Sequence, residues 1–152
     1  MDQCEARICD FGMSTVMEDV TEKAASVTLT SSGSTRWLAP ELIEGLILSP
    51  TFPADTYSFA MAILELLTGK HPFANLKRDA AVIHNIVVLR LTPARPEAPE
   101  VKRWLSDDLW ELMQKCWSPD AHLRPPMAVV VECMKNIEDS FPAVESDALD
   151  IT

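Results

Sequence analysis

The sequence has few basic residues, few glycines and no long apolar run. It holds 13 Lys plus Arg against 23 Asp plus Glu, a formal net charge of −10. This balance excludes a highly basic nucleic-acid binder. Only 4 of the 152 residues are glycine, which excludes a collagen-like repeat. The longest nearly apolar run, residues 57–67, contains Ser58 and Glu65 and is too short to span a bilayer.

The sequence also lacks a metal-binding cysteine motif and a secretory leader. The four cysteines form no CxxC pair, and no histidine stands at metal-ligand spacing from them. We therefore expect reduced thiols, packed as small apolar side chains, in a cytoplasmic protein. Residues 1–5 contain no basic or apolar leader, so we expect no secretory signal.

The overall composition is that of a soluble folded domain. Apolar residues make up 47% and charged residues 24%, which excludes a disordered chain. The length is about that of one domain. Residues 136–152 carry five acids and no Lys or Arg. We therefore divide the chain into a domain over residues 1–139 and an acidic tail over residues 140–152.

Proline, glycine and apolar spacing predict a mainly α fold. We expect a short helix over 40–45 and a longer one over 54–68, closed by Gly69. The apolar residues of the longer helix point to all sides, so it is predicted to lie buried at the centre. Further helices are expected over 78–89, after the capping residue Ser106, and after the paired prolines at 125 and 126.

Two segments break the helical pattern. Residues 6–9 are half apolar and precede a turn, which predicts a short β-hairpin remnant at the N-terminus. Ten of the 23 residues from 13 to 35 are Ser or Thr, which predicts a long polar loop. Such a loop inside a domain is either functional or a flexible linker. The prolines at 93, 96 and 99 argue against a regular helix over 92–100.

Four short motifs follow one another along the chain. They are Asp-Phe-Gly at 10–12, Gly-Ser-Thr-Arg-Trp-Leu-Ala-Pro-Glu at 33–41, Asp-Thr-Tyr-Ser-Phe-Ala at 55–60, and Lys-Cys-Trp at 115–117 with Leu-Arg-Pro at 123–125. In this order they resemble the C-terminal lobe of a eukaryotic protein kinase, over about residues 5–139. Trp37 and the Lys-Cys-Trp motif resemble the tyrosine-kinase-like group of Ser/Thr kinases.

The resemblance implies how the Asp-Phe-Gly motif works. Asp10 would hold Mg²⁺ between the phosphates of ATP, whose negative charge a kinase neutralises with metal ions. Phe11 would pack under a helix of the N-terminal lobe, and Gly12 would give the backbone room to flip. ATP and Mg²⁺ are therefore the implied cofactors, and a protein substrate is the implied partner.

By the same resemblance, the polar loop is the activation segment. A phosphate added there by an upstream kinase brings about −2 charge, which Arg side chains can capture. The candidate acceptors are Ser26, Thr28, Thr30, Ser31 and Ser32. Ser34 stands where Ser/Thr kinases usually carry Thr, and its hydroxyl would bridge the catalytic Asp and a neighbouring Lys. The alternative is that Ser34 merely lies in a turn.

Five further residues have structural roles in the resemblance. Glu41 and Arg124 would form a buried salt bridge, and Asp55 would accept hydrogen bonds from the backbone of the catalytic loop. Trp37 and Pro40 belong to the string that ends in Glu41, and Pro40 suits a first helical position.

The implied function is transfer of the ATP γ-phosphoryl group to Ser or Thr of proteins. A kinase also needs a Gly-rich loop, a strand Lys, a helix Glu and a catalytic loop, none of which these residues contain. We therefore expect the chain to be inactive alone and to be a fragment of a kinase. The alternatives are a pseudokinase-like or orphan C-terminal lobe acting as a scaffold, and an unrelated helical interaction module.

Overall fold

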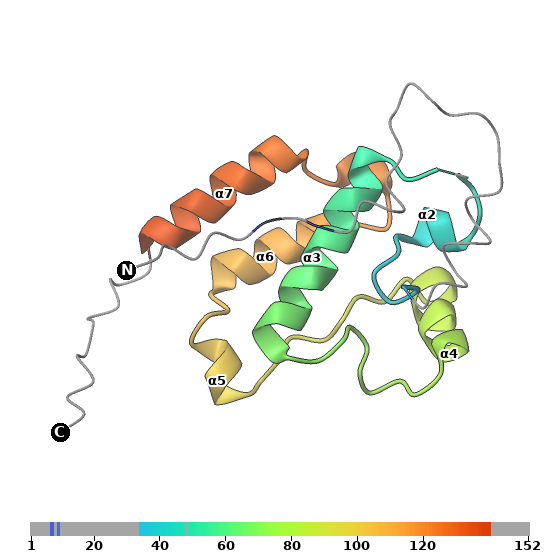
Figure 1. The fold of residues 1–152 in the computed structure, drawn as a ribbon, viewed down its shortest axis with the longest axis horizontal. Helices are drawn as coiled ribbons and strands as arrows, with labels where there is room; N and C mark the ends of the chain where they lie inside the picture. The colour runs from blue at the N-terminus through green and yellow to red at the C-terminus, as the bar shows by residue number, and fades with distance from the viewer. Residues whose placement is uncertain (1–6, 8, 10–33, 48, 141–152) are drawn as a thin grey trace.

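Helices make up the regular secondary structure in the part of the chain that the structure describes (Figure 1). The computed structural model describes residues 7, 9, 34–47 and 49–140. The expected hairpin lies largely outside these residues, as do nearly all of the polar loop and of the acidic tail. The prediction of a mainly α domain is confirmed for the described residues.

Helix α3 (Phe52–Thr68) is the central element of the fold (Figure 1). It begins two residues earlier than predicted, because the Thr51 side chain caps it by accepting a hydrogen bond from the Ala54 N–H at 3.3 Å. Its inward face is buried through Ala54, Thr56, Tyr57, Ala60, Met61 and Leu64. Burial on all sides is incomplete, however, because Phe52 and Leu66 remain 70% and 79% exposed.

Gly69 ends α3 in the left-handed conformation, with φ of 64°. An alanine there would have free space for its Cβ, so backbone strain is the only cost. We expect Gly69→Ala to lower the free energy of unfolding by about 1 kcal/mol. Chemical denaturation of both proteins measures this difference. An unchanged midpoint would contradict the helix-capping role of Gly69.

Helices α2 (Pro40–Ile43) and α4 (Asp79–Ile83) lie on one side of α3 (Figure 1). The predicted single helix over 78–89 is correct in its path, but its second half (His84–Val88) is a π-helix. The Leu89 N–H accordingly donates to the His84 carbonyl five residues back, at 3.1 Å. Buried Val82 and Ile86 anchor this element to the core.

Helices α5 (Pro99–Lys102), α6 (Asp107–Cys116) and α7 (Met127–Ser140) complete the fold on the other side of α3 (Figure 1). α6 packs against both α3 and α7. Ser106 caps α6 as predicted, accepting from the Leu109 N–H at 3.1 Å. The prediction that residues 92–100 form no regular helix is wrong for residues 99 and 100, which belong to α5. Pro99 occupies the first turn of α5, where a missing N–H costs no hydrogen bond.

The core lies where α3, α6 and the segment before α2 meet. Its largest fully buried side chains are Trp117, Tyr57 and Met61. The rings of Trp110 and Trp117 meet edge to face, with centroids 5.5 Å apart. Among the described helices, none has the length and apolar character needed to cross a membrane.

Candidate functional site

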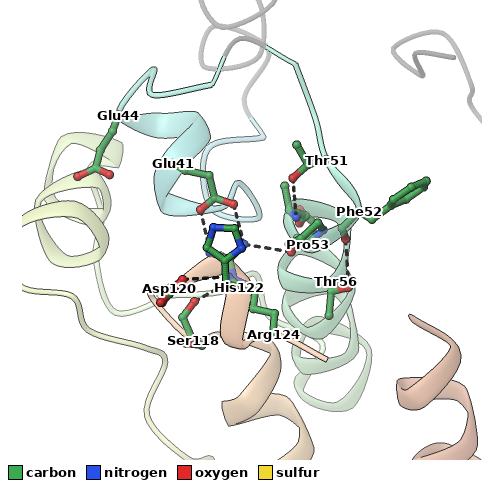
Figure 2. Close-up of polar contacts among 12 residues, drawn as sticks. Glu41, Glu44, Thr51, Phe52, Pro53, Thr56, Ser118, Asp120, His122 and Arg124 are labelled. Atoms are coloured by element: carbon green, nitrogen blue, oxygen red, sulfur yellow. Dashed lines mark hydrogen bonds and ion pairs between the residues drawn. The ribbon is translucent and has the colours of Figure 1, made fainter. Parts of the chain in front are cut away.

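A buried ion pair joins Glu41 of α2 to Arg124, which follows the short 3-10 helix Ala121–Leu123 (Figure 2). Nη1 and Nη2 of Arg124 donate to the two carboxylate oxygens of Glu41 at 2.7 and 2.8 Å. The Arg124 side chain is 0% exposed and that of Glu41 is 14% exposed. This is the pair that the kinase resemblance implies, in a two-pronged geometry that strengthens charge-assisted hydrogen bonds.

The remaining donors of Arg124 reach two carbonyls. Nε donates to Ser118 O at 2.9 Å, and Nη1 donates to Pro53 O at 3.0 Å (Figure 2). The guanidinium also lies 5.1 Å from the ring centroid of Tyr57. Burial of this ring raises the pKa of the Tyr57 hydroxyl well above its ordinary value. A single side chain thus connects α2, the start of α3 and the loop between α6 and α7.

Arg36 forms a second buried network that the sequence did not reveal. Its guanidinium donates to Pro72 O at 3.1 Å and to Phe73 O and Leu76 O, each at 2.9 Å. It also pairs with Asp79 at 3.1 Å. These partners lie 36 to 40 residues away for the carbonyls, so no local pattern predicts them. Arg36 fixes the segment before α2 to the loop between α3 and α4.

Trp37 attaches the same segment to α3. Its indole N–H donates to Glu65 Oε2 at 3.0 Å, and its carbonyl accepts from the Ser58 hydroxyl at 2.8 Å. Ser34 is half-buried just before this attachment, and its carbonyl accepts from the Trp37 N–H at 3.0 Å. The structure therefore places Ser34 at the edge of a rigidly held segment.

Asp55 lies in the first turn of α3, as the sequence predicts. The residue is exposed overall, yet partial burial of its carboxyl raises the pKa of Asp55 above its ordinary value. Within the described residues, no donor reaches this carboxylate. Asp55 is therefore accessible to hydrogen-bond donors from outside the described part of the chain.

Several predicted site residues fall outside the described residues. These are Asp10, Phe11, Gly12 and the five candidate phosphoacceptors Ser26, Thr28, Thr30, Ser31 and Ser32. Residues 34–47 and 49–140 contain no cluster of three or more His, Cys, Asp or Glu that fits a metal ion. The described residues do not make a Mg²⁺ site by themselves.

The helical fold and the Glu41–Arg124 pair are those that the resemblance to a protein kinase lobe implies. Comparison with known families agrees, because the protein kinase domain family matches residues 1–135. The chain therefore belongs to the protein kinase family.

The chain is also similar to individual proteins that are described as protein kinases. Serine/threonine-protein kinase STY17 of Arabidopsis thaliana is 33% identical over 138 residues, which cover 90% of this chain and 22% of that protein. Mitogen-activated protein kinase kinase kinase 10 of Xenopus laevis is 31% identical over 88% of this chain and 12% of its own length. Dual specificity protein kinase pyk3 of Dictyostelium discoideum is 28% identical over 89% and 9%. The chain spans less than a quarter of these relatives.

Proposed function

We propose that residues 1–139 form the C-terminal lobe of a kinase that transfers the γ-phosphoryl group of ATP to Ser or Thr of proteins. The observation that carries this proposal is the fixation of residues 34–41. Arg36, Trp37 and Glu41 each attach this segment to a different part of the lobe. Phosphoryl transfer depends on positioning, so a segment whose Ser34 hydroxyl would bridge to the catalytic loop must be held firmly.

The proposed roles follow the motifs. Asp10 would bind Mg²⁺, which neutralises the charge on the ATP phosphates when bound. The Ser34 hydroxyl would orient the catalytic loop, and Asp55 would accept backbone N–H donors from that loop. This role is supported by the absence of any donor to Asp55 among the described residues.

The proposal also includes regulation of the kinase by phosphorylation and its cellular compartment. An upstream kinase would phosphorylate one of the five hydroxyls of the polar loop, and the added charge would order that loop. We place the protein in the cytoplasm. The described cysteines Cys9, Cys116 and Cys133 are free thiols, which supports a reducing compartment.

The test begins with the transcript. Sequencing upstream of the Met1 codon is expected to reveal an in-frame Gly-rich loop, a strand Lys and a catalytic loop. The longer product should transfer labelled phosphate from ATP to a protein substrate, and residues 1–152 alone should not. A transcript that starts at Met1 would contradict the enzyme function for this product and would support a scaffold.

Asp10→Ala in the longer, active product should reduce phosphoryl transfer to background, because the metal would lose a carboxylate ligand. The matched control is Asp108→Ala, which removes an exposed carboxylate that makes no ion pair within the described residues. Initial rates of label transfer measure both variants. Full activity of Asp10→Ala would show that Asp10 is not the metal ligand.

A further inference from the structure

Positive charge is concentrated in the loop between α3 and α4. Residues 69–78 contain three cationic side chains, Lys70, Lys77 and Arg78, together with His71, but no Asp or Glu. All four side chains are exposed, and none makes an ion pair with another described residue. In a protein of net charge −10, a stretch with three cations and no acid favours an acidic partner.

The same loop forms one wall of a groove of about 350 Å³ at the end of α3. Buried Leu64, Phe73 and Pro93 give the groove an apolar base, and exposed Lys70 and His71 stand at its rim. No acidic residue lines it. Two other grooves of the described residues differ, because acidic side chains line both.

The Asn75 side chain adds a polar group to this groove. It is exposed, and its amide has no hydrogen-bond partner among the described residues. A side-chain amide both donates and accepts, so Asn75 can pair with the backbone of an extended peptide. The groove therefore combines apolar, cationic and amide groups in one place.

The groove wall is held in shape before any partner binds. Phe73 has a positive φ of 55°, and its carbonyl accepts from both Arg36 Nη1 at 2.9 Å and the Leu76 N–H at 2.8 Å. A loop fixed in this way loses little conformational entropy on binding. Arg36 is also two residues from Ser34, so the groove wall is attached to the segment that is proposed to orient the catalytic loop.

We propose that this groove binds an acidic segment of the protein substrate, with apolar side chains interspersed among its carboxylates. The carboxylates would pair with Lys70 and accept a hydrogen bond from the His71 ring at the rim, and the apolar side chains would cover Phe73 and Pro93 at the base. The identity of the partner as a substrate rests on the proposed function. The binding itself requires neither ATP nor phosphoryl transfer.

The test measures binding of a short fluorescent peptide in which Asp and Glu alternate with Leu and Ala. Anisotropy is recorded with the 152-residue chain in the absence of ATP. Lys70→Glu is expected to weaken binding about fivefold, since it replaces an attraction with a repulsion. Lys135→Glu is the matched control, because Lys135 is also exposed, makes no ion pair among the described residues and changes the net charge equally. It should leave the affinity nearly unchanged.

A second variant guards against a local folding defect in Lys70→Glu. Ala74→Glu places a carboxylate at an exposed position of the groove without removing any described hydrogen bond, and it should weaken binding similarly. Circular dichroism checks that the variants fold. Raising the salt from about 50 to about 300 mM should weaken the wild-type complex, because screening shortens the reach of exposed charges.

Three outcomes would overturn the inference. The first is equal affinity of wild type, Lys70→Glu and Ala74→Glu, and the second is equal binding of a peptide with Lys in place of its acids. The third is a rise in affinity when residues 141–152 are deleted, which would assign the groove to the chain's own acidic end. Peptide binding by a full-length product that transfers no phosphate would instead contradict the proposed function and leave the groove assignment intact.

Discussion

Glu41→Ala is expected to lower the free energy of unfolding by about 3–5 kcal/mol, because it leaves the charge of Arg124 buried without a partner. The Arg124 side chain is fully buried, so water cannot replace the lost carboxylate. Arg124→Ala should cost at least as much, since it also removes the donors to Ser118 O and Pro53 O. Urea denaturation of each variant measures the change.

The control for this pair is Glu44→Ala. Glu44 pairs with Arg90 at 2.8 Å, but the Arg90 side chain is 45% exposed. An exposed pair contributes no more than about 1 kcal/mol. If Glu41→Ala and Glu44→Ala destabilise the protein equally, the Glu41–Arg124 pair does not carry the energy assigned to it.

Arg36→Ala should destabilise the protein by about 3 kcal/mol or more, because three buried or partly buried carbonyls each lose a charged donor at once. Its second effect is local, since Arg36 holds the loop 72–76. Hydrogen exchange in that loop should be faster in Arg36→Ala than in the wild type. The increase should be larger than in α6, which the substitution does not touch. Arg36→Lys should recover little, because an ammonium cannot reproduce the planar donor geometry of a guanidinium.

Lys102→Ala serves as the control for this prediction. Lys102 pairs with Glu97 at 2.6 Å, but both side chains are more than half exposed. We expect a change within about 1 kcal/mol and no effect on exchange in the loop 72–76. Unaltered exchange in Arg36→Ala would mean that the loop keeps its shape without this side chain.

Local rules predicted the elements that depend on neighbouring residues. Gly69 and Ser106 mark helix ends correctly, because a left-handed glycine and a capping hydroxyl act within one turn. The π-helical turn at His84–Val88 was missed, since the 3.6-residue apolar spacing does not distinguish it from an α-helix. The exposed Leu66 was missed because apolar spacing does not show which neighbours cover a helix.

The sequence predicted only those contacts of the candidate site whose residues belong to motifs of the kinase family. The Glu41–Arg124 contact follows from the family resemblance, although 83 residues separate the two. Arg36 lay inside a recognised motif, but three of its partners are backbone carbonyls that any residue type could supply, and the fourth is the distant Asp79. Sequence patterns do not specify such partners, so the network that positions Ser34 required the three-dimensional structure.

The long sequence separation between Glu41 and Arg124 also affects when their contact can form during synthesis on the ribosome. At roughly 5 to 20 residues per second, adding the 83 residues that lead from Glu41 to Arg124 takes roughly 4 to 17 s. During that interval α2 has been made but its cationic partner has not. The Glu41–Arg124 pair therefore cannot form until residue 124 has been added, so the parts of the lobe that it joins come together only after α6 has been synthesised.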